Sequence, residues 1–338
     1  MNSFISFANK RTKKVYDAIM ERISTIDQIN YRIINEFISR KNFYLRPGLI
    51  FLTAELFGAS AYDALLPAIS MQLSNEWMLI HDDIEDNAIQ RRGKRALHKI
   101  FGEEQAINTG DYLHTLSWEP ICEFLYKNRK IGKLVYNKFT DIIKTTISSQ
   151  SEDLDFSHFV GSFKNINELK YYKIASGKGA YYSVYGPMQL GAIIANQNIK
   201  TINILKDIGE PAGIAAQIQN DILDMIEKSK SGIKFQDIYE GKLTLMLIHT
   251  VKLANKYEKL QIKKIYSKKQ NKTVYDINFI VRLFKKYNSI EYAKEMRDKY
   301  GDFAQKKFKE YEQLLPNNKF RRILKDAINA QYKNYKHT

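Results

Sequence analysis

Hydrophobic residues recur along most of the chain at the three- and four-residue spacing of an amphipathic α-helix. The clearest run lies near the end, where apolar residues occupy positions 320, 323, 324, 327 and 328. The segment Pro316-Asn317-Asn318 precedes this run and has the composition of a helix start. Sustained alternation of apolar and polar residues, the pattern of strands, is hard to find. The sequence therefore predicts an all-α protein.

No Gly/Ser-rich linker or break in composition divides the 338 residues. The chain has only six prolines, which suits long helices because proline inside a helix costs about 3 kcal/mol. One plausible surface loop is the polar segment 267–273. We therefore predict a single helical domain spanning residues 1–338.

The chain is strongly basic, with a formal net charge of +16. Such a charge suits nucleic acid, an anionic membrane or small anionic substrates. The basic residues are spread along the sequence, with a denser stretch from Lys252 to Lys286, and no nucleic-acid-binding signature accompanies them. We interpret the charge as a lysine-rich solvated surface and expect no nucleic-acid partner.

The sequence contains no apolar run of about 18 residues, so no membrane span is expected. Basic residues at positions 10, 11, 13 and 14 interrupt any apolar N-terminal signal. The single cysteine, Cys122, excludes an intramolecular disulfide and a cysteine-based zinc cluster. These features favour a cytoplasmic location.

An acidic motif, Asp82-Asp83-Ile84-Glu85-Asp86, follows an apolar helical stretch. Residues i and i+4 of a helix share one face, so Asp82 and Asp86 would lie about 6 Å apart along the axis. Their like charges repel each other, so a bound cation would stabilise the pair, and a set of oxygen ligands suits Mg²⁺. A related motif, Asn220-Asp221-Ile222-Leu223-Asp224, recurs far along the chain. Two such motifs favour a metal site over the alternative, an exposed acidic helix face.

Basic residues follow the first acidic motif as Arg91-Arg92-Gly93-Lys94, one to two turns later if the helix continues. Arginine binds phosphate through two parallel hydrogen bonds. Magnesium and arginine beside an apolar helix suit a substrate with a diphosphate head and a hydrocarbon tail. The segment Gly177-Lys178-Gly179 is not a P-loop, because Tyr172 and Gly179 occupy positions that require Gly and Ser or Thr.

In combination, these motifs resemble those of the trans-isoprenyl (polyprenyl) diphosphate synthases, short-chain type. Residues 82–93 resemble the family's first aspartate-rich motif, and residues 217–224 resemble the second. Residues 149–154 are similar to its GQxxDL segment, with Ser149 in place of Gly, and residues 178–187 to its KT-containing helix, with Gly179 in place of Thr. Gly110-Asp111 and residues 237–242 also match, and the resemblance runs in order from about Arg46 to Lys242.

The resemblance implies an antiparallel helical bundle around a central cavity, the isoprenoid synthase class I fold, and usually a homodimer. It implies a transferase that condenses an allylic diphosphate with isopentenyl diphosphate and yields a short-chain trans-prenyl diphosphate. It also implies three Mg²⁺ ions that bind the allylic diphosphate between the two aspartate-rich motifs.

The resemblance assigns expected roles to individual residues. The metal ligands would be Asp82, Asp86, Asn220 and Asp224. The allylic diphosphate would be held by Arg91, Lys178 and Lys242, and isopentenyl diphosphate by Arg46 and Arg92, with Asn75 in the same site. Gln217 would lie near the allylic phosphates, and Lys234 would stand in for a phosphate-binding lysine. The catalytic set would be Asp82, Asp86, Lys178 and Gln217.

Besides Ser149 and Gly179, the chain departs from the family pattern at four positions. Phe43 replaces a lysine, Asn75 replaces His or Gln, Asn220 replaces an aspartate, and Ile233 stands where a phosphate-binding lysine is expected, just before Lys234. The first two changes fall in the expected isopentenyl diphosphate site. They leave three alternatives open: a class I terpene synthase, a prenyltransferase with another acceptor, or a low-activity regulatory subunit of a heteromeric synthase.

Product length in this family is often set four and five residues before the first aspartate, here Met78 and Trp77. Helical geometry places Met78 about 40° around the axis from Asp82, and Trp77 about 140° around. We expect the rigid Trp77 to be the floor of the hydrocarbon cavity; the alternative is that it packs against a neighbouring helix. Geranylgeranyl diphosphate is the first expected product and farnesyl diphosphate the second.

Overall fold

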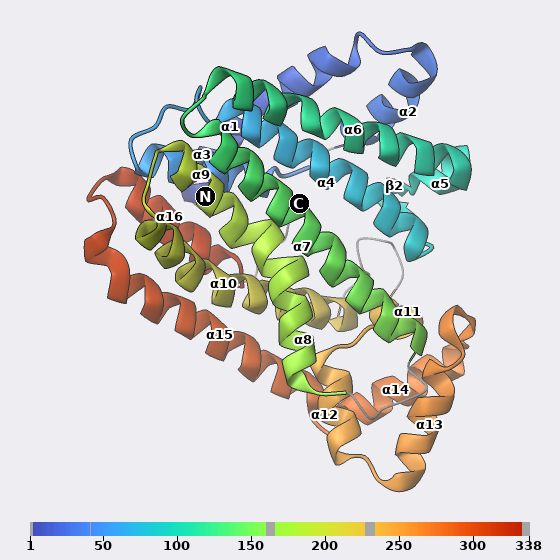
Figure 1. The fold of residues 1–338 in the computed structure, drawn as a ribbon. Helices are drawn as coiled ribbons and strands as arrows, with labels where there is room; N and C mark the ends of the chain where they lie inside the picture. The colour runs from blue at the N-terminus through green and yellow to red at the C-terminus, as the bar shows by residue number, and fades with distance from the viewer. Residues whose placement is uncertain (1–2, 41, 160–165, 227–233, 333–338) are drawn as a thin grey trace.

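The structure is a computed structural model that describes residues 3–40, 42–159, 166–226 and 234–332. Within these residues the regular structure is helical apart from two strands of two residues each, β1 (Gln90–Arg91) and β2 (Lys94–Arg95), which pair antiparallel. The prediction of an all-α fold is confirmed (Figure 1).

The helices of the first half of the chain are α1 (Ser3–Ile23), α2 (Gln28–Ile38), α3 (Leu45–Leu56), α4 (Leu65–Glu85), α5 (Leu97–Phe101), α6 (Glu103–Lys127) and α7 (Gly132–Phe159). The second half begins with α8 (Glu168–Ile174), the π-helix η2 (Ala175–Tyr185), α9 (Gly186–Ile194), α10 (Ile199–Ile226) and α11 (Gln236–Glu240). It continues with α12 (Leu245–Leu253), α13 (Lys256–Tyr266), the 3₁₀ turn η3 (Lys269–Asn271), α14 (Val274–Lys286), α15 (Ser289–Tyr311), the 3₁₀ turn η4 (Glu312–Leu314) and α16 (Lys319–Ala330).

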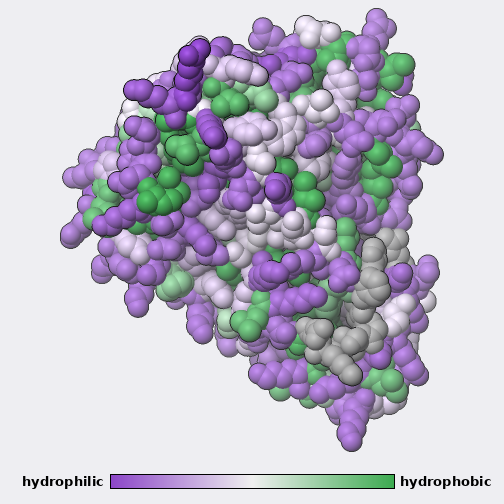
Figure 2. All heavy atoms as spheres, in the orientation of Figure 1, coloured by the Kyte–Doolittle hydropathy of each residue, from purple (hydrophilic) through white to green (hydrophobic). Residues whose placement is uncertain are grey.

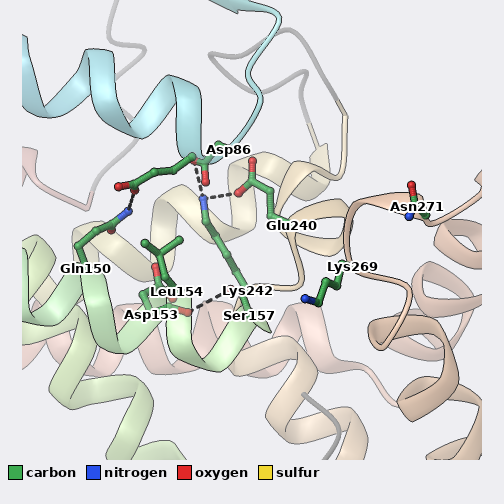
Figure 3. Close-up of a pocket in the computed structure, with 10 residues that line it drawn as sticks. Asp86, Gln150, Asp153, Leu154, Ser157, Glu240, Lys242, Lys269 and Asn271 are labelled. Carbon is green, nitrogen blue, oxygen red and sulfur yellow. Dashed lines mark hydrogen bonds and ion pairs between the residues drawn. The ribbon is translucent and has the colours of Figure 1, made fainter. Parts of the chain in front are cut away.

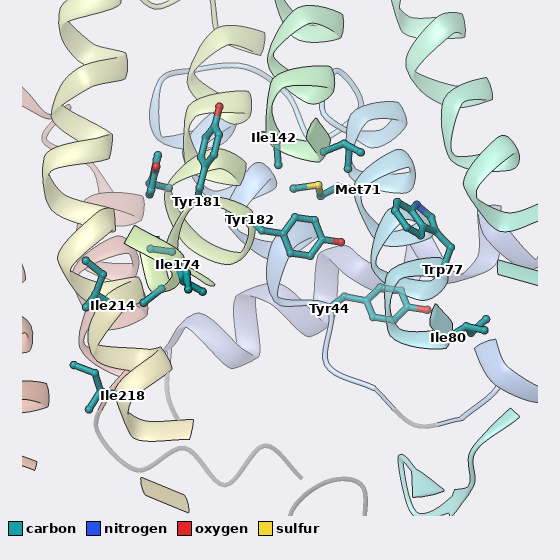
Figure 4. Packing of buried hydrophobic residues seen from close by; sticks show 14 of the residues in the cluster. Tyr44, Met71, Trp77, Ile80, Ile142, Ile174, Tyr181, Tyr182, Ile214 and Ile218 are labelled. Atoms are coloured by element: carbon teal, nitrogen blue, oxygen red, sulfur yellow. The ribbon is translucent and has the colours of Figure 1, made fainter. Parts of the chain in front are cut away.

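The long helices pack in pairs, with α4 against α6, and α10 against both η2 and α15. Apolar side chains from α4, α7, η2 and α10 fill the interior, among them Met71, Ile142, Tyr182 and Ile214 (Figure 4). A second buried cluster joins α1, α3 and α9 to α15 and α16. Burial of these apolar faces is the main favourable term in folding.

The predicted final helix and surface loop are both present. In α16, Leu324, Ala327 and Ile328 are buried, and the side chain of Asn318 caps the helix by accepting from the amide of Phe320. The segment 267–273 is a connection that contains η3 and ends at Thr273, which caps α14. None of the described helices is both long and apolar enough to cross a bilayer.

The arginines that follow the first acidic motif lie on a hairpin, whereas the sequence suggested a continuing helix. Helix α4 ends at Glu85, and positive φ angles at Arg92 (54°) and Gly93 (75°) form the turn between β1 and β2. A left-handed conformation at two successive residues is the geometry of a tight hairpin turn. The buried guanidinium of Arg40 donates to the carbonyl oxygens of Arg91 (3.1 Å) and Arg95 (3.0 Å). The hairpin is therefore anchored to α2.

Close packing brings α10 against the π-helix. A Cβ atom at Gly213 would overlap Ala180, so only glycine permits this approach. One turn further along α10, Gln217 faces Gly179, where a Cβ atom would lie 3.2 Å from the Gln217 side-chain oxygen. The π-helix carries Lys178 and Ser183, and π-helical segments occur frequently at functional sites.

Candidate active site

The two outer aspartates of the first motif lie at the C-terminal end of α4 and have basic or amide partners. Asp82 accepts from Arg91 Nη2 (3.4 Å) and from Gln150 Nε2 of α7 (3.5 Å). Asp86 caps the helix and accepts from Lys242 Nζ at 3.2 Å. Carboxylates and cations that are far apart in the sequence therefore meet at this end of α4.

Asp83 is fully buried and shares the Arg91 guanidinium with Asp82. Its carboxylate accepts from Arg91 Nε at 2.7 Å, and its Oδ2 atom has no hydrogen-bond partner among the described residues. Burial raises the pKa of Asp83 to about 6, although Arg91 opposes the shift. The Asp83–Arg91 pair fixes the guanidinium beside Asp82.

Two lysines face the first motif from the opposite side. Lys178 of η2 donates to Asp153 of α7 at 3.0 Å. Lys242, just after α11, contacts both Asp86 and Glu240 (Figure 3). Burial acts to lower the pKa of Lys242, but the surrounding carboxylates outweigh it and hold this pKa well above its ordinary value. Both lysines therefore carry positive charge at neutral pH.

Three adjacent cavities connect the predicted site residues. The first, of about 370 Å³, is lined by Asp86, Gln150, Asp153, Glu240 and Lys242, among others (Figure 3). The second is small; it shares Asp153 and Lys242 with the first and adds Lys178, Gln217 and Asp221. The third, of about 570 Å³, shares Gln217 with the second and includes Arg46, Asn75, Arg91, Arg92 and Asn220.

The residues of the second acidic motif have three different environments. Asn220 is exposed and lines the third cavity. Asp221 is buried in the second cavity, where it accepts from the hydroxyl of Tyr171 (2.7 Å) and the amide of Gln217 (2.9 Å). Burial raises the pKa of Asp221 to about 7. Asp221 therefore lines the same small cavity as Lys178 and Lys242.

Asp224 binds the N-terminal end of α11. Its two carboxylate oxygens accept from the backbone amides of Gln236 (3.0 Å) and Asp237 (3.1 Å). Carboxylates are stabilising at helix N-termini, where backbone amides lack partners within the helix. Asp224 thereby positions the short helix that ends at Glu240, and it is not among the residues that line the three cavities.

Arg46 lies across the third cavity from the hairpin. Its guanidinium donates to the carboxamide of Asn75 and the hydroxyl of Ser183, both at 2.7 Å, and lies 4.1 Å from the ring centre of Tyr182. Phe43 lines the same cavity. Two residues that depart from the family pattern, Phe43 and Asn75, therefore border the space that holds Arg46.

Arg92 forms a bidentate ion pair with Glu76 of α4. The two terminal nitrogens lie 2.8 and 3.2 Å from the two carboxylate oxygens of Glu76, which is fully buried. The amide of Gln72 also donates to Glu76. Arg92 is thus oriented toward the third cavity by a carboxylate that the sequence did not single out.

Besides Asp82 and Asp224, three predicted residues, Lys234, Trp77 and Met78, lie outside the linings of the three cavities. The ammonium of Lys234 is 5.0 Å from the ring centre of Phe235, and Ile233 lies outside the described residues. The indole of Trp77 is buried and packs edge-on against His114 of α6, with ring centres 4.9 Å apart. This is the environment expected if Trp77 packs against a neighbouring helix. Met78 is partly buried.

Several residues of the site were missed as individual candidates. Gln150 and Asp153 stand in the matched segment 149–154, and Glu240 stands in 237–242, so their motifs were visible although their roles were not. Glu76 and Tyr171 belong to no motif that we recognised. An acidic residue inside the apolar run before Asp82 was the available signal for Glu76.

The oxygen donors suit a hard divalent cation. Asp82 and Asp86 offer carboxylates on one side, and the Asn220 carboxamide faces the adjoining third cavity. Among the described residues, no three His, Cys, Asp or Glu side chains are grouped tightly enough to hold a metal by themselves. Mg²⁺ is usually bound by one or two carboxylates together with substrate phosphates, and this arrangement has that character.

Comparisons with known proteins agree with this geometry. A sequence model described as polyprenyl synthetase matches residues 27–284. The geranylgeranyl diphosphate synthase of Saccharolobus solfataricus is 29% identical, over 89% of this chain and 88% of its own. A short chain isoprenyl diphosphate synthase of Methanocaldococcus jannaschii is 30% identical, over 74% of each chain.

The fold has close structural counterparts as well. The crystal structure of geranylgeranyl pyrophosphate synthetase from Pyrococcus horikoshii superposes with a TM-score of 0.83 at 26% identity and covers 98% of each chain. Enzymes of this family use isopentenyl and allylic diphosphates and bind diphosphate with a divalent metal. From its motifs, its site and these relatives, we conclude that the chain belongs to the polyprenyl synthetase family and is a prenyltransferase.

Proposed function

We propose that this prenyltransferase condenses an allylic diphosphate with isopentenyl diphosphate to form a short-chain trans-prenyl diphosphate. The observation that carries the proposal is the convergence of Asp86, Lys178 and Lys242 on two cavities that share lining residues. Geranylgeranyl diphosphate is the first candidate product and farnesyl diphosphate the second. The names of the relatives from Saccharolobus and Pyrococcus support this order.

The allylic diphosphate would occupy the first two cavities. Lys178 and Lys242 would hold it there and Arg91 would contact it from the adjoining third cavity, since all three place cationic groups close to Asp82 or Asp86. We further propose that Asp82 and Asp86 hold Mg²⁺ on one side of the site. Asn220 would be a ligand on the facing side, with Asp224 next to it along α10. Three Mg²⁺ ions would bind in all. When bound, the metal would offset negative charge that develops on the leaving diphosphate.

The chain's own cations would act on the same charge. As the allylic C–O bond breaks, the electron pair goes to the diphosphate oxygen, and fixed ammonium and guanidinium groups stabilise it. Gln217 would hold the phosphates from α10, because its side chain lines both the second and the third cavity. Lys234 would contribute only if its segment moves from its contact with Phe235.

Isopentenyl diphosphate would bind in the third cavity, with its phosphates near Arg46 and Arg92. Its double bond would attack the allylic cation, forming the new C–C bond. Loss of a proton from the adjacent carbon would restore an alkene, and the released diphosphate is the acceptor we propose. Water must be excluded during this step, because it would quench the cation.

We also propose that residues 1–338 form one domain, because α16 packs on α1 and α3 at the other end of the chain. A homodimer is proposed on the family resemblance. Exposed apolar side chains on α6 and α7, such as Ile107, Leu134 and Ile147, provide surface for it. Light scattering of the purified chain at several concentrations would measure its oligomeric state.

One incubation tests the proposed reaction. The chain is mixed with Mg²⁺, radiolabelled isopentenyl diphosphate and an allylic diphosphate of five, ten or fifteen carbons. A longer prenyl diphosphate supports the proposal. Hydrocarbon or alcohol from the allylic substrate alone would indicate a terpene synthase, and a labelled product only with a different acceptor would indicate another prenyltransferase. No turnover with any of these would favour a regulatory subunit.

A further inference from the structure

The outward side of α13 is unusual in composition. It consists of Lys256, Tyr257, Lys259, Leu260, Lys263 and Lys264, all exposed, and we call these six residues the α13 face. Tyr257 is 65% exposed and Leu260 is 50% exposed. The inward side, with Ile262, Ile265 and Tyr266, is buried. Figure 1 places α13 at the outer edge of the molecule.

Positive charge is concentrated around this helix. Residues 252–286 contain eleven Lys and Arg against two acidic residues, a net charge of +9. The whole chain carries +16, so about a tenth of the sequence holds more than half of the excess. A concentration of this kind creates a local potential that attracts anionic partners.

Both acidic residues of this segment are turned inward and neutralised by other lysines. Glu258 is 7% exposed and pairs with Lys286 at 2.6 Å. Asp276 is 5% exposed and pairs with Lys268 at 2.7 Å. The α13 face therefore contains no carboxylate, and none of its four lysines forms an ion pair with another described residue. Its ammonium groups point to solvent.

The face also carries apolar groups among the lysines. On a helical wheel Leu260 lies between Lys256 and Lys264, and Tyr257 lies at the margin of the exposed arc. Leu253, just before the helix, is 50% exposed. Figure 2 shows hydrophobic atoms among hydrophilic ones along the same edge of the molecule. Exposed lysines and exposed apolar side chains therefore lie side by side on this face.

We propose that the α13 face docks on an anionic lipid bilayer. Near such a surface each lysine strengthens binding about fivefold. Tyr and Leu would enter the boundary between headgroups and acyl chains, where tyrosine is enriched in membrane proteins. The occupant is a lipid surface rather than a nucleic acid, because the face combines lysines with a central aliphatic group and borders none of the three cavities of the active site. Binding is reversible and weakens with salt.

The test is co-sedimentation of the full chain with vesicles. Vesicles of phosphatidylcholine with 30% phosphatidylglycerol are compared with pure phosphatidylcholine at low and high salt. One variant carries Lys256→Glu, Lys259→Glu, Lys263→Glu and Lys264→Glu. A matched control carries the same charge change at the exposed Lys10, Lys14, Lys200 and Lys206. A third variant, Leu260→Ser, tests the apolar contribution while keeping the charge.

We expect the chain to sediment with anionic vesicles only, and the α13 variant to bind at least tenfold more weakly. The control should keep most of the binding, and Leu260→Ser should weaken it severalfold. Turnover of substrates in solution should be unchanged in all variants, which also verifies folding. Absence of binding to anionic vesicles, equal loss in the control, or binding to RNA but not to vesicles would each overturn the proposal.

Discussion

The buried carboxylate of Glu76 holds Arg92 by both terminal nitrogens, at 2.8 and 3.2 Å, and so joins α4 to the hairpin. The Arg92 guanidinium lies over the Phe37 ring, 4.9 Å from its centre, which leaves it little freedom. Removing one member of a buried ion pair leaves an uncompensated charge, whereas replacing both can be nearly neutral. The ion pair therefore holds the Arg92 guanidinium in place at the third cavity.

Glu76→Gln should destabilise the protein by about 3 kcal/mol, because Arg92 loses its charged partner in a buried setting. The double variant with Glu76→Met and Arg92→Met should be less destabilised than Glu76→Gln. Urea unfolding of the three proteins measures the difference. A double variant that is less stable than the single one would contradict this description of the pair.

Phe43→Lys should lower the KM for isopentenyl diphosphate severalfold and leave the KM for the allylic substrate unchanged. The reason is that Phe43 borders the third cavity beside Arg46, so a lysine there adds a charge where the diphosphate is proposed to bind. Lys94 does not already supply that charge, since it is bound to Glu36 at 3.2 Å, and Lys41 lies outside the described residues. Steady-state kinetics with each substrate varied provides the measurement.

Phe303→Lys is the matched control, because Phe303 is 46% exposed on α15 and the substitution adds the same charge there. Its kinetics should equal those of the original chain. If Phe43→Lys shifts the allylic KM instead, the assignment of the third cavity to isopentenyl diphosphate is wrong.

The helical fold was predictable because it follows from local spacing, and the meeting of the motifs was predictable only from the family resemblance. Apolar residues at helical intervals predicted α16, and the matched motifs indicated that Asp82, Lys178 and Lys242 would meet. Those residues are brought together by helix packing, for example by the contact of Gly213 with Ala180. The contact itself leaves no mark in the local sequence pattern.

Other features depended on interactions that local patterns do not encode. A positive φ angle at Asn87 (50°) follows the end of α4, and those of Arg92 and Gly93 then form the hairpin turn, although neighbouring residues are compatible with helix. The π-helix has no sequence signature that we recognised. Glu76 pairs with Arg92, which lies 16 residues further along the chain. Asp224 accepts from Gln236 and Asp237, which lie 12 and 13 residues further along. The sequence did not specify the geometry that brings these partners together.

Trp77→Ala tests the proposed control of product length. We expect products longer by at least one isoprene unit, because a large rigid side chain is lost between α4 and α6. Met78→Ala is the companion variant, since Met78 lies closer to Asp82 around the helix. Chromatography of the hydrolysed products compares the three proteins. Lengthening in Met78→Ala alone would transfer the role to Met78, and lengthening in neither would place the floor on another helix.

Lys272 should contribute stability to the fold that rises with pH above about 8. Its ammonium is buried and donates to the carbonyl oxygens of Tyr239 (2.8 Å) and Lys269 (2.5 Å). Burial lowers the pKa of Lys272 from its ordinary 10.5 to about 8. Between these values the unfolded chain binds more protons than the folded one, so the free energy of unfolding increases, by at most about 1.4 kcal/mol per pH unit.

Urea unfolding between pH 7 and 9 would measure this increase, because the buried tyrosines, whose pKa values burial raises above 10, stay largely protonated in that range. Lys272→Met should remove it, whereas Lys263→Met, at an exposed position, should retain it. Parallel curves for the original chain and Lys272→Met would show that Lys272 does not cause the dependence.

The most direct test of the central claim is the rate of diphosphate release from farnesyl diphosphate in the presence of isopentenyl diphosphate, with Mg²⁺ and with excess chelator. We expect release only with the metal. Asp82→Ala and Asp86→Ala should each lose at least a hundredfold in rate while keeping their circular dichroism spectra, and Asp17→Ala, at an exposed position on α1, should keep full activity. Full activity of either motif variant, or undiminished release in chelator, would contradict the assignment of this site.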